Sequence, residues 1–557
     1  MRDWRATLSV AAAAVIPLAC AAGEPAAPQP GEPPSAGPPT VSASIGPSPL
    51  RRMSDAEYLN ALHDLFPGPS PALPQLPADV PVAGFDNAAE AQQASDVLIA
   101  RYEAIANLYA QAAAGDAPSA SALTGCADWS TADLATACAT QFIGSTGRRL
   151  FRRPLTGDEA QHLLTRFQSW QAAVDFPGAV QLTLRTMLQS PQFVYRPEPT
   201  PTGALPGAIV PVEPYALATR LSFLLWQSVP DDALLDAAQQ GALATPDQLR
   251  AQVDRMLDDP RARRALWSFH RQWLGLDRIL LPEGATRTAA VDPAWTAATQ
   301  ASALRESELF VENVLGQGGT FRDLLTSRRA WVDGEMARVY GLPARVDRTE
   351  WAPVVLPGAE RAGLLTRTAF LAGYAHAGAT SPPVRGNAIE LRILCSLPIS
   401  PPPGVNVSQP MVPPGSGPAT NRTLFEQRTA PAACQSCHTE LNGFGFGFEH
   451  YDAAGHFQTT DDGLPVDATG WILATDVDGR FDGALQLSDR LARSVTVSAC
   501  ATRQWMRFAL GRAAVDGEEP ALTALTSGFV QSEGDVRALL EAIATSASFT
   551  TMIVGAD

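Results

Sequence analysis

Apolar residues recur at helical spacing along most of the chain, and helix-capping residues mark where several of these stretches begin. Ser54 with Glu57 forms one capping box, and Thr156 with Glu159 forms another. Thr245 precedes a proline, the arrangement expected of an N-cap followed by the first helical position. We expect further helices over residues 88–114, 179–189, 231–240, 261–274, 290–315 and 360–377.

Strand signals are sparse by comparison. Short apolar runs at 464–466 and 472–473 are punctuated by Gly and Asp, a pattern typical of short strands and turns. Two Pro-rich stretches, at 21–49 and 401–418, are expected to be a tether and a connector. The pattern therefore predicts a mainly α fold with several helical modules in series and a small β element near 464–473.

The residues Cys434-Gln435-Ser436-Cys437-His438 match the C-x-x-C-H attachment motif of a c-type haem. On a helix the cysteines and the histidine share one face, because positions i, i+3 and i+4 lie on the same side. Cys434 and Cys437 can form thioethers with the haem vinyl groups, and His438 can be an axial ligand of the iron. We therefore expect covalent haem c on a helix that precedes the small β element. A zinc half-site and a dithiol or disulfide pair are the alternatives for the same residues.

The second axial ligand would decide between electron transfer and small-molecule chemistry. Met506 is the first candidate, because a thioether ligand favours electron transfer; core filling is the ordinary role of such a methionine. His450, His456 and Met411 are further candidates, and an open position would permit peroxidase-like chemistry. Four aromatic residues after the motif could line a haem pocket or pack as ordinary core: Phe444, Phe446, Phe448 and Tyr451.

The first twenty residues have the pattern of an export signal. Arg2 and Arg5 make a short basic region, and residues 6–18 are apolar but too few to span a bilayer comfortably. Cys20 follows at the place where a bacterial lipoprotein is cleaved and lipidated. Ala19-Cys20-Ala21 also fits an ordinary signal-peptidase site, so the anchor has an alternative. Both interpretations place the mature chain outside the cytoplasm, and the first predicts a membrane anchor on Cys20.

Composition excludes several functional classes. The net charge is −16, with 57 acidic against 41 basic residues, which disfavours binding to nucleic acid. The chain contains no lysine, which excludes a P-loop lysine, a Schiff base and a lysine general base. G-x-S-x-G and H-E-x-x-H are also absent.

Two charge clusters have competing interpretations. Arg148, Arg149, Arg152 and Arg153 could bind haem propionates or an acidic partner, or form surface salt bridges. The acidic residues of 461–482 suggest calcium at first sight, but their spacing is not that of an EF-hand, and turns explain them.

Seven cysteines occur in the chain, of which Cys20, Cys434 and Cys437 already have an expected role. Outside the cytoplasm the remaining four should pair as disulfides. Two of them are close in sequence and two would bracket the C-x-x-C-H region, although four cysteines allow three pairings. These four are Cys126, Cys138, Cys395 and Cys500.

Several segments resemble, in order, the modules of a family of exported bacterial proteins known from planctomycetes and their relatives. That family consists of consecutive domains of unknown function, one of which contains a cytochrome c-type C-x-x-C-H. The resemblance implies modules at 50–115, 140–200, 212–345, 358–478 and 479–557, the fourth of which carries the motif. The segments that resemble the family are 51–60, 151–156, 217–230, 381–455 and 508–512. His450 and His456 depart from the residues usual in the family at those positions.

These observations predict an exported, membrane-tethered c-type haem protein that transfers electrons. It would reside in the periplasm or on the outer membrane and cell surface, with helical modules that dock a redox partner protein of the cell envelope. A non-redox envelope scaffold, in which the two cysteines form a disulfide or a zinc half-site, is one alternative. An extracellular oxidoreductase is another, although the sequence names no substrate.

Overall fold

The computed structural model describes residues 45–281, 291–343, 349–375, 379–398 and 417–555. The expected signal segment with Cys20, most of the tether and the connector with Met411 lie outside the described residues. Helices dominate the described part, as the apolar periodicity predicts, and the described residues form one compact unit. Among the described helices, none is long and apolar enough to cross a bilayer.

The first group of helices surrounds a core of its own. Tyr58, Phe142, Phe167 and Phe193 are fully buried in this core, which the capped helices close from several sides. The helices are α1 (Asp55–Leu65), α2 (Asp96–Ala114), α3 (Ala117–Thr124), α4 (Ala132–Phe151), α5 (Gly157–Ala173), α6 (Phe176–Leu188) and α7 (Pro191–Val194).

The helices from residue 214 onward, α18 excepted, contribute side chains to a second, larger core. At its centre the rings of Phe269 and Trp505 stack with centroids 3.6 Å apart, although 236 residues separate them in sequence. The helices are α8 (Pro214–Trp226), α9 (Asp232–Gln239), α10 (Pro246–Asp258), α11 (Ala262–Trp273), α13 (Ala297–Gly316), α14 (Phe321–Thr326), α15 (Gly334–Val339), α16 (Thr368–Gly373), α17 (Pro382–Ala388), α18 (Asn421–Thr429), α19 (Ala432–Gly445), α20 (Gly483–Leu491), α21 (Val495–Leu510), α22 (Glu519–Gln531), α23 (Val536–Ala544) and α24 (Ala547–Thr550).

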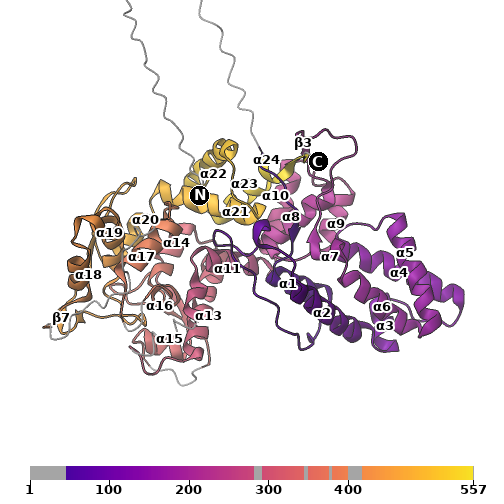
Figure 1. Ribbon diagram of the computed structural model, residues 1–557, viewed down its shortest axis with the longest axis horizontal. Coiled ribbons are helices and arrows are strands. Elements are labelled where there is room, and N and C mark those ends of the chain that lie inside the picture. The colour runs from indigo at the N-terminus through magenta and orange to yellow at the C-terminus, as the bar shows by residue number, and fades with distance from the viewer. Residues whose placement is uncertain (1–44, 282–290, 344–348, 376–378, 399–416, 556–557) are drawn as a thin grey trace, which may run out of the picture. The chain divides into compact units, whose positions relative to one another are not determined.

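The strands are short and pair two by two in antiparallel fashion. The last two pairs lie after α19 and form the small β element that the sequence predicts. The other pairs join distant segments, so that the C-terminal strand lies beside β3 (Figure 1). The pairs are β1 (Arg51–Arg52) with β2 (Tyr195–Arg196), β3 (Ile209–Pro211) with β10 (Thr551–Ile553), β4 (Arg329–Val332) with β5 (Ala352–Val355), β6 (Thr460–Asp461) with β7 (Leu464–Pro465), and β8 (Thr469–Ile472) with β9 (Gly479–Asp482).

Local helix signals are confirmed where capping chemistry is explicit. Capping boxes form at Ser54, Thr156 and Thr245. The helix expected over 360–377 is wrong: a 3-10 turn precedes the short α16. Gly363 explains the break, because its φ is +63° and a Cβ there would lie 2.0 Å from the Leu325 carbonyl oxygen. The helix expected over 88–114 begins later, at Asp96.

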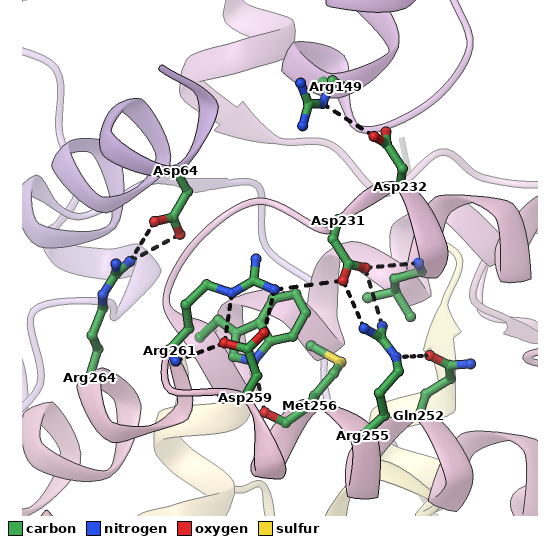
Figure 2. A network of polar contacts seen from close by, with 12 residues as sticks. Asp64, Arg149, Asp231, Asp232, Gln252, Arg255, Met256, Asp259, Arg261 and Arg264 are labelled. Atoms are coloured by element: carbon green, nitrogen blue, oxygen red, sulfur yellow. Dashed lines mark hydrogen bonds and ion pairs between the residues drawn. The ribbon is translucent and has the colours of Figure 1, made fainter. Parts of the chain in front are cut away.

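An ion-pair network connects helices of the two cores (Figure 2). Arg264 of α11 binds both carboxylate oxygens of Asp64 at the end of α1, each at 3.0 Å. Beside it, the Arg261 guanidinium lies 3.5 Å from the centre of the Trp226 ring and pairs with Asp259 at 2.7 Å. Cation–π contact and charge pairing together hold this junction in one geometry.

Candidate functional site

Helix α19 places the thiols and the imidazole of the C-x-x-C-H motif on one half-buried face. Cys434, Cys437 and His438 are each half-buried on this helix, as the i, i+3 and i+4 spacing predicts. Leu441, one turn after Cys437 and His438, is buried on the same face, and the exposed residues of these turns are uncharged. The exposed neighbours are Pro431, Ala432, Ala433, Gln435, Ser436 and Thr439.

The described cysteines divide into two kinds. Cys126 is joined to Cys138, with Cα atoms 6.0 Å apart, and Cys395 is joined to Cys500, with Cα atoms 5.4 Å apart. The structure thus selects one of the three pairings that the sequence left open. Cys434 and Cys437 are the free thiols of the described chain.

A hydrogen-bonded relay lies behind His438. Nδ1 of His438 is 3.2 Å from Oδ1 of Asn442, one helical turn further along α19. Nδ2 of Asn442 donates to Oγ1 of Thr429 at 3.0 Å. Thr429 in turn donates to the carbonyl oxygen of Phe425 at 2.7 Å. Asn442 and Thr429 are both buried, so the relay links α19 to α18 away from solvent.

The polarity of this relay determines the tautomer of His438. The Thr429 hydroxyl has one proton, and Phe425 accepts it, so Thr429 can only accept from the Asn442 amide nitrogen. The Asn442 oxygen therefore faces His438 and requires a proton on Nδ1. A neutral imidazole protonated at Nδ1 presents a lone pair at Nε2, the form that ligates a metal. The two free thiols and this tautomer fit the donor set of a c-type haem.

Helix α19 is seated on α17 by direct backbone contact. A Cβ on Gly386 of α17 would lie 1.8 Å from the Leu441 carbonyl oxygen. A Cβ on Gly445 would lie 1.9 Å from the Pro382 carbonyl oxygen. Only glycine allows this approach, because any side chain would meet backbone atoms that cannot move aside.

Arg385 fixes the loop that follows α19. Its fully buried guanidinium donates to the carbonyl oxygens of Phe448, Tyr451 and Asp452, at 2.9–3.0 Å, and to that of Leu371 at 3.1 Å. Burial lowers the pKa of Arg385 to about 10, with the Glu449 and Asp452 carboxylates opposing that shift. Four carbonyl acceptors satisfy a charge that would otherwise be costly to bury.

The aromatic residues after the motif pack as core. Phe444, Phe446, Phe448 and Tyr451 are each at most 2% exposed. The intervening glycines serve protein packing: a Cβ on Gly447 would lie 2.6 Å from the Phe481 ring. The described part of the chain therefore uses these rings for its own interior and leaves the α19 thiol face on the outside.

The structure does not bring Met506 to His438. Met506 is buried in the second core on α21, which packs against α22, α8 and α23, whereas α19 packs against α17 and β8. This packing assigns Met506 to the core and not to the thiol face of α19, because a thioether fills irregular space well. His450 stacks on Phe457 with Nδ1 2.9 Å from the Gln458 carbonyl, and His456 pairs with Asp452 at 2.8 Å.

Other metal interpretations find little support in the geometry. Within the ranges that the structure describes, no three His, Cys, Asp or Glu side chains are arranged to hold a metal ion. Asp461 accepts a hydrogen bond from the Asn421 backbone at the start of α18, and Asp476 accepts one from the Val495 backbone at the start of α21. These carboxylates therefore cap helices, as turn chemistry suggests.

The four arginines near residue 150 have internal partners. Arg149 pairs with Asp232 at 3.6 Å (Figure 2), and Arg148 pairs with Asp236 at 2.5 Å. Arg152 is buried and donates to four backbone carbonyls, and Arg153 pairs with Glu159. The hydrogen bonds and ion pairs of these arginines therefore serve the fold.

Sequence reasoning missed both members of the relay. Asn442 could have been found, because the i+4 position after His438 lies on the same helix face. Thr429 could not, since the turn at Ala430 and Pro431 that brings α18 against α19 has no distinctive local signal.

Five family models match the chain in consecutive order, and each is described as a protein of unknown function. In chain order these are DUF1587 (residues 51–115), DUF1595 (138–198), DUF1592 (212–342), DUF1588 (361–461) and DUF1585 (478–549). The DUF1588 model, also named PSCyt3, covers α19 and its free thiols. Searches of curated proteins and of solved structures returned no match.

Proposed function

We propose that this modular protein, built from five consecutive domains of unknown function, is an exported c-type haem protein that transfers electrons. Cys434 and Cys437 would hold the haem covalently, and His438 would be its axial ligand. The short name PSCyt3 of the module that contains α19 points in the same direction.

The observation that carries the proposal is the hydrogen-bonded relay behind His438, from which its tautomer is inferred. The relay through Asn442 and Thr429 keeps the proton on Nδ1 and the lone pair on Nε2. A metal-bound histidine commonly has such a hydrogen-bonded partner at its other ring nitrogen. The free thiols lie on the same face, while the other described cysteines are paired.

Haem iron supplies reversible one-electron chemistry when it is bound. The residues of this chain would attach the haem and orient its axial ligand. Cys434 and Cys437 would anchor the group to a helix, and the Gly386 and Gly445 contacts hold that helix rigidly on α17. An axial ligand fixed in this way changes little on electron transfer, which keeps the reorganisation of the site small.

The location follows from the N-terminal pattern. A lipid on Cys20 would tether the protein to a membrane in the periplasm or at the cell surface. Residues 21–49 would then allow the modules to extend away from that membrane. A redox partner protein of the cell envelope would then supply or accept the electron. Net charge of −16 favours a partner with a basic docking face.

The test is absorbance of the protein made in a host that attaches haem to exported C-x-x-C-H motifs. The proposal expects a Soret band that survives acid-acetone extraction. C434S/C437S should lose it, and H438A should change its position. Ser436→Ala, at a variable position of the same motif, is the matched control and should retain the native spectrum.

A colourless wild-type protein would overturn the proposal. Two thiols joined to each other, or zinc bound at one equivalent, would instead identify the envelope scaffold. Peroxide turnover by the coloured protein would identify an open iron position and an oxidoreductase.

A further inference from the structure

A small cavity lies where four of the five modules meet. Its volume is about 10 Å³, enough for one water-sized particle. The charged residues that line it come from four matched regions: Arg51 from 51–115, Glu198 from 138–198, Arg220 from 212–342 and Arg512 from 478–549. A ligand bound in the cavity would therefore contact all four modules and affect how they hold together.

Two of these arginines are already neutralised. Arg220 binds both oxygens of Glu198, at 2.7 and 2.5 Å. Arg512 binds both oxygens of Glu518, at 2.8 Å each. Bidentate pairs of this kind satisfy the charge of each partner.

Arg51 has no comparable counter-ion. It is 5% exposed, its nearest carboxylate oxygen is that of Glu198 at 3.7 Å, and Arg220 already holds that group. One long hydrogen bond to the Ala509 carbonyl, at 3.3 Å, completes its contacts. Three guanidinium groups therefore face two carboxylates around the cavity, and Arg51 carries the excess positive charge.

A further buried cation, Arg196, lies beside Arg51 and has its own carboxylate partner. Arg196, paired with Arg51 in the register of β1 and β2, reaches Glu57 at 3.3 Å through Nη1. In the described part of the chain, its Nε and Nη2 have no hydrogen-bond acceptor. Burial, followed by the charge of Arg196, lowers the pKa of Arg51 to about 9.

The chain is packed closely around these guanidinium groups. Gly511 has a φ of +62°, and a Cβ there would lie 2.7 Å from Cδ of Arg51. A Cβ on Gly46 would lie 2.4 Å from Cζ of Arg512. Ser48 accepts a hydrogen bond from Arg220 at 2.9 Å, so its own proton can be donated elsewhere. The cavity thus has fixed walls, a surplus of positive charge and a neutral donor.

We infer that this cavity binds one small monovalent anion of halide size, which neutralises Arg51 and stabilises the junction of the four modules. Phosphate and sulfate, each with four oxygens, need more room than a monatomic halide. A water molecule fits but leaves the buried charge uncompensated.

Bromide is the probe, because its anomalous scattering identifies it by element. Crystals of the full chain grown in sodium bromide should show an anomalous peak in the cavity beside Arg51. Density without an anomalous signal there, or peaks only at exposed arginines, would mean water or an adventitious ion only and would overturn the inference.

Thermal unfolding supplies a second measurement. At constant ionic strength, replacing gluconate with bromide should raise Tm along a saturable curve. Arg51→Gln should abolish the saturable part, whereas Arg493→Gln, at an exposed arginine, should keep it. If Arg51→Gln does not fold, Ser48→Ala should raise the bromide concentration at half-saturation several-fold. A Tm that depends only on ionic strength would contradict the site.

Discussion

The side-chain oxygen of Asn442 accepts a hydrogen bond from Nδ1 of His438 across one turn of α19. Thr429 on the neighbouring helix accepts one from the amide nitrogen of Asn442 and so fixes the orientation of that amide. The relay therefore controls how strongly the imidazole donates electrons at Nε2. Because its members come from two helices, the orientation of the His438 imidazole depends on how α18 sits on α19.

Two different substitutions of Asn442 should move the reduction potential of the haem-loaded protein in opposite directions. Asn442→Leu removes the acceptor, weakens donation by the imidazole and should raise the potential. Asn442→Asp places a negative charge there, stabilises the ferric state and should lower it. Potentiometric titration with optical detection measures both.

Thr439→Ala, on the exposed side of the same helix, is the control and should leave the potential unchanged. Equal reduction potentials in the wild type, both Asn442 variants and Thr439→Ala, all with haem attached, would show that the relay is structural. Absence of haem would instead count against the proposed function.

The glycine contact between α17 and α19 should be intolerant of a methyl group. Gly386→Ala should cost about 3 kcal/mol or more of unfolding free energy, because the new Cβ would lie 1.8 Å from the Leu441 carbonyl oxygen. Urea denaturation measures the loss.

Gly528→Ala is the matched control, since Gly528 lies within α22 and a Cβ there would meet no neighbouring atom within 4 Å. That change should be neutral or stabilise by about 0.5–1 kcal/mol. Similar losses at both positions would show that the close approach does not matter.

The two disulfides should differ in their contribution to stability. Cys395 and Cys500 are 105 residues apart, and Cys126 and Cys138 are 12 apart. By the loop-entropy model, the protein should lose about 5 kcal/mol when both cysteines of the longer loop become serine, and about 3 kcal/mol for the shorter loop. Equilibrium unfolding in urea compares the two double variants. A larger loss from the short loop would contradict the expected order.

His270 should make the protein less stable in acid. It is fully buried, with Nδ1 2.7 Å from the Leu266 carbonyl oxygen, and burial lowers its pKa to about 4. Between pH 6.5 and 4 the unfolded chain binds this proton and the folded chain does not, so stability falls as pH falls through that window. The loss reaches about 3 kcal/mol near pH 4.

Unfolding free energies at pH 7, 5.5 and 4.5 measure the effect, with His270→Gln compared against the wild type. The difference between the two proteins should shrink as the pH falls, because only the wild type carries the buried imidazole. His162→Gln, on the exposed face of α5, should follow the wild-type slope. If the unfolding free energy of His270→Gln falls with pH as steeply as that of the wild type, His270 is not the source of the acid instability.

Local sequence determined the helix starts and the face of the motif. Ser54, Thr156 and Thr245 cap helices because each hydrogen bond spans only three residues, and Cys434, Cys437 and His438 share a face because helix geometry is regular. The mainly α fold and the small β element follow from the same short-range periodicity.

Tertiary structure alone decided which distant groups meet. The pairing of Cys395 with Cys500, the place of Thr429 behind His438 and the excess charge at Arg51 each depend on chain segments whose approach no local pattern encodes. The free energy that brings them together comes from burial of a shared core, which is non-directional and summed over many residues. For that reason Met506 could be a ligand or a core residue by sequence, and only packing placed it in the interior.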